Sequence, residues 1–178
     1  MLKLLSGEIL NKKTECLVVP VCEDAEIHDD SAIIGLIKNA KKIKEFNGKK
    51  GESLIFYDLA NSKSERVLFV GLGKLEKIDA EAMRSFAGKI VKQLIEKELT
   101  EAIICAPSLS KSDLKAHDSL GAILEGAFLG NHIFDKYKKD KKAKPLKNVS
   151  VFTDLKIAKI YYSVLDSDAN KRTTQRAL

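Results

Sequence analysis

The sequence predicts an α/β fold, with a mixed, mostly parallel sheet that helices cover on both faces. Apolar runs of strand length alternate along the chain with longer segments whose apolar residues recur at helical spacing. Some of the short runs are continuously apolar, which is typical of strands buried on both faces. The 178 residues, 44% hydrophobic and 31% charged, suffice for one domain with its own core.

The first part of the chain predicts two strands and a helix. Residues 2–9 and 15–21 are apolar and of strand length, and a polar Asn-Lys-Lys-Thr segment separates them. From Ser31 to about Lys44, isoleucine and alanine side chains recur at helical spacing. Ser31, or an aspartate just before it, can cap this helix. The glycines that follow, Gly48 and Gly51, are expected to end it.

The middle of the chain predicts two strands and a long helix. Residues 53–59 and 66–73 read as strands, joined by a turn at residues 61–64, and the second is apolar enough to lie inside the sheet. Asp79 is placed to cap the helix that follows. One apolar face is predicted for that helix, made of Met83, Phe86, Ala87, Ile90, Val91, Leu94 and Ile95.

The last part predicts a buried strand at residues 102–107, a second long helix and a final strand at residues 148–154. Ser110 or Ser112 is expected to open the helix, which reaches about Phe134. Residues 1–154 are therefore expected to form the compact unit. Residues 155–178 keep a helical spacing at first and then lose apolar density, so they are expected to form a linking helix.

The positive charge is concentrated in one place. Residues 136–147 hold seven lysines and one acid, which equals the net charge of +6 of the whole chain. The stretch has a single aromatic residue, Tyr137, and no arginine, which disfavours nucleic-acid binding by base stacking or bidentate readout. A solvated loop is the favoured interpretation, and a weak patch for phosphate or an acidic partner is the alternative.

Several features favour the cytoplasm. No apolar run approaches the roughly 20 residues of a membrane span, and an acid at Glu8 falls where a signal peptide would have its apolar core. The three cysteines form no CxxC pair, and Cys16 and Cys105 lie within apolar runs. They are expected to be buried thiols of a reducing compartment.

The segment Gly71-Leu72-Gly73-Lys74 follows a strand and precedes a helix, which is the context of a dinucleotide-binding loop. The third glycine of that motif would fall on Glu76, whose carboxylate would repel a pyrophosphate. A phosphate-binding P-loop would need glycine at Leu68 and Ser or Thr at Leu75. A plain glycine turn is therefore the favoured interpretation.

The histidines are the candidate metal ligands of the sequence. His28-Asp29-Asp30 lies near three further acids, Glu23, Asp24 and Glu26, but the spacing of a calcium loop is absent. His117-Asp118 and His132 stand apart from other ligand types, and no HExxH motif occurs. A solvated acidic loop is the favoured interpretation of residues 23–30.

No residue is predicted to be a nucleophile. The chain has no GxSxG motif, and nothing in the sequence around Cys105 marks this cysteine as activated. The residues themselves therefore predict no catalytic, cofactor-binding or metal site in this chain.

Two stretches carry a family signature. In the first, Val70-Gly71-Leu72-Gly73-Lys74 precedes a helical segment with Arg84, Ala87 and Gly88. The second has Glu125-Gly126, Leu129-Gly130, Phe134-Asp135 and Tyr137-Lys138, with His132 where the family usually has Tyr. Together with residues 47–52, Asn-Gly-Lys-Lys-Gly-Glu, they resemble the N-terminal domain of the leucyl aminopeptidase (cytosol aminopeptidase) family. The resemblance spans most of residues 1–165.

The resemblance implies a macro-domain-like fold for residues 1–154. It also implies a catalytic domain in the same parent chain, to which residues 155–178 would lead and which this chain lacks. The parent would be a hexameric aminopeptidase that removes N-terminal residues from peptides, using two divalent metal ions, zinc or manganese. This chain would carry none of the metal ligands, and its role would be oligomer assembly or substrate access.

A rival function follows from the macro-domain relation. Residues 6–21 are similar to the opening of macro domains, which bind ADP-ribose through an aspartate and asparagines in that segment. Here Glu8 replaces the aspartate, and Pro20-Val21-Cys22 replaces the asparagine-containing run. The alternative is therefore a stand-alone macro-like module that binds ADP-ribose or another nucleotide.

Overall fold

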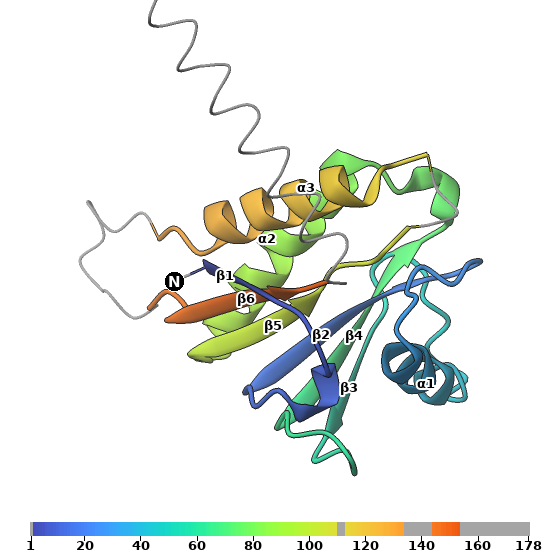
Figure 1. Ribbon diagram of the computed structural model, residues 1–178, viewed down its shortest axis with the longest axis horizontal. Helices are drawn as coiled ribbons and strands as arrows, with labels where there is room; N and C mark the ends of the chain where they lie inside the picture. Colours follow the sequence, from blue (N-terminus) through green and yellow to red (C-terminus); the bar gives the residue numbers. More distant parts are fainter. Residues whose placement is uncertain (1, 110–112, 134–143, 154–178) are drawn as a thin grey trace, which may run out of the picture.

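The computed structural model describes residues 2–109, 113–133 and 144–153. Within them, the chain forms one six-stranded sheet of order β1-β6-β5-β2-β4-β3 (Figure 1). All neighbouring strands run parallel except β3, which pairs antiparallel with β4 at one edge of the sheet. The predicted α/β class, with a mixed and mostly parallel sheet, is confirmed.

The strands occupy the apolar runs that the sequence shows. Their bounds are β1 Leu2–Leu5, β2 Cys16–Cys22, β3 Ser53–Tyr57, β4 Arg66–Gly73, β5 Glu101–Cys105 and β6 Asn148–Phe152. Strand β2 lies in the middle of the sheet and is buried along its whole length, as its apolar sequence predicts. Strand β4 is also interior, between β2 and β3.

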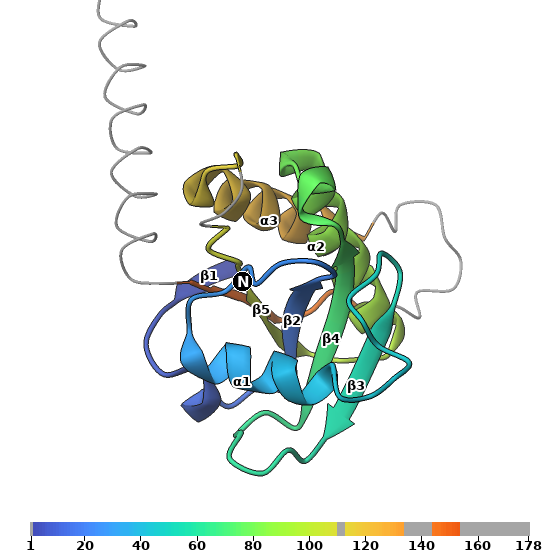
Figure 2. The same cartoon turned by 90° about the vertical axis from the view of Figure 1, so that its right-hand side faces the viewer.

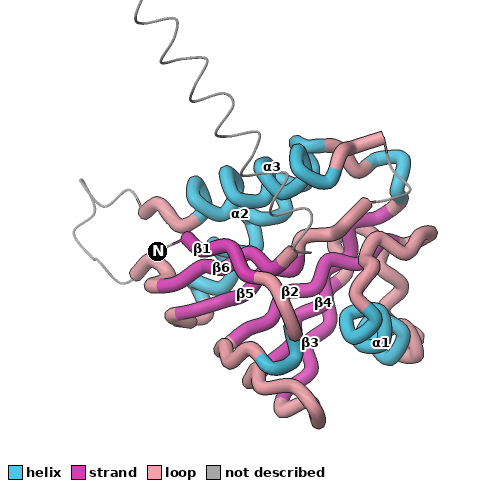
Figure 3. The backbone as a smooth tube through the Cα atoms, viewed as in Figure 1, coloured by secondary structure: helices cyan, strands magenta, loops and turns pink. Residues whose placement is uncertain are grey.

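The helices form a layer on each face of the sheet. Helices α2 (Ala80–Glu96) and α3 (Ala116–Gly130) lie side by side on one face, and α1 (Ser31–Ala40) lies on the other (Figures 1 and 2). Figure 3 shows the long loop between α1 and β3 on the side of the molecule where α1 lies. This three-layer arrangement confirms the predicted covering of both faces.

Two apolar layers hold the sheet and helices together. Successive residues of β2 point to opposite faces, so Val18 packs in the layer beneath α2 and α3, while Leu17 and Val19 pack in the layer beneath α1. Phe46 and Phe69 lie in the second layer with their ring centroids 6.2 Å apart. A sheet with both faces buried requires this continuous apolar pattern in its central strand.

The predicted helix after residue 107 is wrong at its start. It begins at Ala116, behind Lys115, and not at Ser110 or Ser112, which lie outside the described residues. The backbone N–H groups of Ser108 and Leu109 donate to the carbonyl of Ile27, at 2.9 and 3.3 Å. This long-range pairing, with Leu109 at a left-handed φ of 52°, holds residues 108 and 109 out of a helix, where sequence spacing alone predicts an early cap.

Other predicted bounds are too long. The helix from Ser31 ends at Ala40, and the first strand ends at Leu5, ahead of a short 3-10 turn at Ile9–Asn11. Helix α3 ends at Gly130, because the side chain of Asn131 exchanges two hydrogen bonds, at 2.8 and 3.0 Å, with the backbone of Leu146. The predicted strand ends at residues 59, 107 and 154 also lie past the observed ones.

Some predictions fall outside the described residues. These are the linking helix of residues 155–178 and most of the lysine-rich stretch 136–147. Among the described residues, no helix combines the length and the apolar character needed to cross a membrane.

Candidate functional site

The first family-like motif packs against the loop of residues 47–52. The N–H of Gly71 donates to the carbonyl of Glu52 at 2.8 Å, and the N–H of Gly73 donates to that of Gly48 at 3.0 Å. A Cβ on Gly71 would lie 2.0 Å from the carbonyl oxygen of Lys49, closer than any side chain allows. We call this contact between residues 47–52 and residues 71–73 the strand clasp.

Glu52 organises the loop side of the strand clasp. Its carboxylate accepts hydrogen bonds from the backbone N–H groups of Asn47, at 2.8 Å, and Lys49, at 3.1 Å. The bond from Asn47 is the main cause that lowers the pKa of Glu52 below its ordinary value. The Asn-Gly-Lys-Lys-Gly-Glu segment is therefore a folded loop whose last residue bonds back to its first.

The other motifs meet where α2 crosses α3. A Cβ on Gly126 would lie 2.1 Å from the carbonyl oxygen of Arg84, and one on Gly130 would lie 2.6 Å from that of Gly88. The guanidinium of Arg84 pairs with Glu125 through Nη2 at 2.8 Å and Nε at 3.0 Å. We call this contact the helix clasp. It brings together Arg84 and Gly88 of one motif with Glu125, Gly126 and Gly130 of the other.

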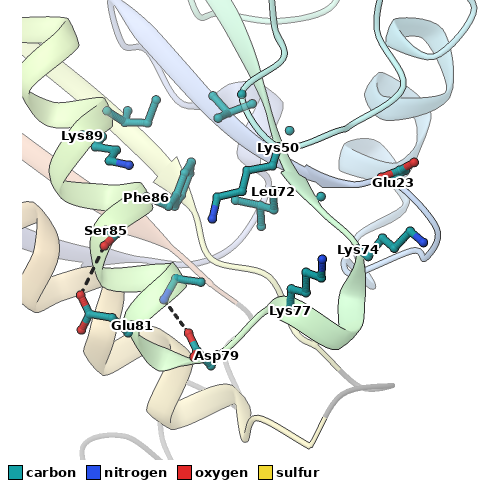
Figure 4. A pocket seen from close by; sticks show the side chains of 16 residues that line it. Glu23, Lys50, Leu72, Lys74, Lys77, Asp79, Glu81, Ser85, Phe86 and Lys89 are labelled. Atoms are coloured by element: carbon teal, nitrogen blue, oxygen red, sulfur yellow. Dashed lines mark hydrogen bonds between the residues drawn. The ribbon is translucent and has the colours of Figure 1, made fainter.

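A groove of about 770 Å³ lies beside the strand clasp (Figure 4). One wall is Lys50 and Gly51 of the loop, the end of the groove is formed by residues 71–74 and Lys77, and the other wall is α2 from Ala82 to Ile90. Apolar side chains lie between these walls, namely Val70, Leu72, Phe86 and Ile90. The volume is in the range of small-molecule sites.

Some charged groups along the groove have bonded partners, and others have none. Asp79 caps α2 by accepting from the N–H of Ala82 at 2.7 Å, and Glu81 pairs with Arg84. No ion pair or side-chain hydrogen bond within the described part of the chain involves the ammonium groups of Lys50, Lys77 and Lys89. The groove therefore presents free cationic groups over an apolar surface.

A second, smaller cavity of about 270 Å³ lies at the carboxyl end of β2. This is where open α/β sheets usually bind ligands. Glu23, Asp24 and Glu26 line it, and the ammonium group of Lys41 is occupied by the carbonyl of Cys22 at 2.8 Å. A ligand with phosphate groups would meet three carboxylates there, so the cavity is poorly suited to a nucleotide.

The acidic segment of residues 23–30 has structural contacts that sequence reasoning missed. Asp24 accepts from the N–H of Leu75 at 2.9 Å, and this bond is the main cause that lowers its pKa. Asp30 caps α1 by accepting from the N–H of Ala32 at 2.8 Å, as the sequence predicts for an aspartate before Ser31. Among residues 2–109, 113–133 and 144–153, no three His, Cys, Asp or Glu side chains come close enough to hold a metal ion.

His28 is a buried part of the fold and not an exposed member of the acidic loop. Its Nε2–H donates to the carbonyl of Pro20 at 2.8 Å, and burial lowers the pKa of the ring to about 4. The hydrogen bond to Pro20 and the nearby Asp29 and Asp30 oppose this shift only in part. The imidazole is therefore neutral in the folded protein at neutral pH.

Acid is expected to destabilise the fold through His28. The unfolded chain binds a proton near pH 6.5, whereas the folded one resists protonation until about pH 4, so this contribution is present above pH 6.5 and is lost as the pH falls toward 4. Between pH 7 and pH 5 the free energy of unfolding should drop by about 2 kcal/mol from this group. Urea unfolding of the wild type and of His28→Gln at both pH values measures it. An equal drop in the two proteins would contradict this assignment.

The cysteines are buried, as predicted for Cys16 and Cys105, and all three are free thiols. Burial raises the pKa of Cys16 to about 12 and that of Cys105 further still. Cys22 also has a raised pKa, mainly through burial, and its thiol lies 3.1 Å from the carbonyl of Gly73. Raised pKa values disfavour the thiolate, which is the nucleophilic form.

The other residues considered as site candidates in the sequence do not come together in one site. His117 lies 3.3 Å from Asp118, its neighbour in sequence, and His132 lies at an exposed position after α3. Glu8 bonds to Asn11, and Pro20, Val21 and Cys22 belong to the buried β2.

The groove lysines were not predicted from the sequence, because isolated lysines in a loop and on a helix have no characteristic spacing. Phe86 was assigned to the apolar face of α2, where it lies.

The chain matches a family model described as "Cytosol aminopeptidase family, N-terminal domain" over residues 18–141. Among curated relatives, a probable cytosol aminopeptidase of Nitrosococcus oceani is 31% identical over 84% of this chain and 31% of its own length. One of Pseudomonas syringae pv. tomato is 28% identical over 86% of this chain and 32% of its own length. The chain thus spans about a third of the length of the curated relatives it matches.

Solved structures share the fold. A tomato leucine aminopeptidase mutant matches with a TM-score of 0.63 and 18% identity, over 85% of this chain and 32% of that one. A macrodomain mutant of Oceanobacillus iheyensis matches with a TM-score of 0.63 and 14% identity, over 96% of this chain and 93% of that one. The predicted macro-domain-like architecture is therefore confirmed.

Proposed function

Because this chain belongs to the cytosol aminopeptidase family and corresponds to its N-terminal domain, we propose that it is the non-catalytic N-terminal domain of a leucyl aminopeptidase. The observation that carries the proposal is the family match over residues 18–141. The parent enzyme would remove N-terminal residues from peptides in the cytoplasm. Its two divalent metal ions, zinc or manganese, would lie in the catalytic domain of the same parent chain. Residues 155–178 would connect the two domains.

For the domain itself we propose a role in assembly of the parent hexamer or in substrate access. An apolar surface on α3 and β1 supports this role. Phe128 and Leu129 are 67% and 61% exposed, and Leu2 is 37% exposed. Leu2 and Phe128 share a depression with Asn131, His132 and Val149. Large apolar side chains that lie exposed and close together are typical of surfaces that another domain covers.

A domain exchange tests the role. Three proteins are compared: the intact Nitrosococcus relative, its catalytic part alone, and that catalytic part fused to this chain in place of its own N-terminal domain. Sedimentation measures the assembly state, and turnover of a leucine anilide and of a longer peptide measures access. The proposal expects the catalytic part alone to lose assembly or peptide turnover, and the fusion to recover what is lost.

Two results would overturn the role. One is a catalytic part that assembles and cleaves both substrates as well as the intact relative does. The other is a fusion whose N-terminal domain is folded by amide spectra but that behaves like the catalytic part alone. Saturable binding of ADP-ribose to this chain, measured by calorimetry, would favour the alternative of a nucleotide-binding module.

A further inference from the structure

The groove beside the strand clasp is built from three separate parts of the chain. Lys50 comes from the loop after α1, Lys77 from the connection between β4 and α2, and Lys89 from the third turn of α2. Figure 4 shows the side chains of Lys50 and Lys77 extending into the space between the loop and α2, with Phe86 beside them. The hydrogen bonds of the strand clasp hold the loop against β4, and α2 is held on the sheet by its buried apolar face.

Three ammonium groups of the groove have no bonded partner in the described part of the chain. Three acids line the groove: Asp79 is bound to the N–H of Ala82, Glu81 is bound to Arg84 and Ser85, and Glu23 lies on the side away from Phe86 and Lys89 (Figure 4). Lys74 differs from the other lysines of the groove, because the carboxylate of Asp24 lies near it. Within the described residues, the ammonium groups of Lys50, Lys77 and Lys89 have neither an ion pair nor a hydrogen bond.

The surface between the lysines is apolar. Phe86 and Ile90 of α2, which are 7% and 5% exposed, form the floor of the groove, and the half-buried Val70 and Leu72 of β4 lie beside them. An inorganic anion would pair with the lysines but leave the apolar surface in contact with water. A neutral apolar molecule would cover that surface but leave the lysines without partners. Both features are used by a molecule that joins an anionic head to an apolar body.

We propose that this groove binds a small organic anion, with a sulfonate, carboxylate or phosphate head among Lys50, Lys77 and Lys89 and an apolar or aromatic body against Leu72 and Phe86. The site shares only Glu23 with the acidic cavity at the end of β2. It does not rest on the aminopeptidase assignment, because it uses only groups within this chain. Failure of the domain exchange would leave it standing, and its own failure would leave that role standing.

The test uses the whole chain and two fluorescent probes with the same ring system. Anilinonaphthalene sulfonate carries the anionic head, and phenylnaphthylamine lacks it. We expect the sulfonate probe to bind with one-site stoichiometry and at least tenfold more tightly than the neutral one, with an affinity that falls as salt is added. Amide chemical shifts should change at residues 71–74 and 82–90.

Two double variants with the same change in charge separate the groove from the rest of the surface. Lys50→Gln/Lys77→Gln should weaken binding of the sulfonate probe about tenfold, roughly threefold for each exposed charge. Lys63→Gln/Lys92→Gln, at exposed positions that do not line the groove, should change it less than about twofold.

Three outcomes would overturn the proposal. The first is equal affinity of the two probes, which would show that apolar contact alone drives binding. The second is an equal effect of the two double variants, which would show a response to net charge only. The third is a set of shifted amides around Phe128 and Leu129 in place of those along the groove. Unchanged amide spectra of the free variants verify that each remains folded.

Discussion

Gly126→Ala is expected to lower the free energy of unfolding by about 3 kcal/mol or more. The added Cβ would lie 2.1 Å from the carbonyl oxygen of Arg84, and 3.0 Å from its Cα, so only a shift of one helix can relieve the overlap. That shift would also separate Arg84 from Glu125 and loosen the apolar layer beneath α2 and α3. Urea unfolding followed by circular dichroism measures the change.

Gly35→Ala is the matched control, because Gly35 also lies in a helix but a Cβ there meets nothing within 4 Å. Alanine should stabilise that helix by up to about 1 kcal/mol. Gly88→Ala should fall between the two, since its Cβ would lie 3.3 Å from the carbonyl oxygen of Gly126. Similar stabilities for all three variants would show that the two helices are not packed as closely as described.

Gly71→Ala is expected to have a comparable effect on the other clasp, again about 3 kcal/mol. Its Cβ would lie 2.0 Å from the carbonyl oxygen of Lys49 and 2.8 Å from the carbonyl carbon of Gly48, so the loop would have to leave β4. The hydrogen bonds of Gly71 and Gly73 to the loop would then be lost. Amide hydrogen exchange at these two residues, together with urea unfolding, measures the loss.

Lys74→Ala serves as the control for this clasp. Lys74 is exposed, follows β4 directly and makes no hydrogen bond to the loop, so its removal should change the free energy of unfolding by no more than about 0.5 kcal/mol. If Gly71→Ala keeps the protection of both amides, the loop does not depend on the bare backbone of Gly71, and the strand clasp as described is wrong.

The two clasps explain why the family resemblance can be read from scattered residues. Arg84 and Gly88 lie on one helix and Glu125, Gly126 and Gly130 on another, and the structure brings them into a single contact. Where a Cβ would overlap a backbone carbonyl, only glycine fits. The close contact therefore requires glycine at that position of the sequence. The motifs identify the domain through its packing.

Strands and helices were predictable where local pattern decides them. The run Cys16–Cys22 is apolar throughout and lies in the middle of the sheet, and Asp79 caps α2 as its place before the apolar periodicity indicates. The predicted helix bounds were wrong where contacts between residues far apart in sequence set the observed ends. Ahead of α3, Ser108 and Leu109 bond to Ile27, far away in sequence, and the end of α3 depends on Asn131 bonding to Leu146.

The candidate site was less predictable than the fold. The sequence predicts a plain glycine turn at Gly71-Leu72-Gly73-Lys74, but the structure shows both glycines in β4, in contact with the loop of residues 47–52. The groove beside them depends on where α2 leaves part of β4 uncovered, which is a matter of packing. His28 was predicted within a solvated acidic segment, but its side chain is buried against Pro20.

Peptide hydrolysis by this chain alone tests the central claim, that its signature residues hold the domain together and the chemistry belongs to another domain. Purified chain is incubated with a leucine anilide and added manganese or zinc, beside an intact cytosol aminopeptidase and a metal-only blank. We predict the same rate as the blank. Turnover that remains with the chain through successive purification steps and disappears on chelation would contradict the account.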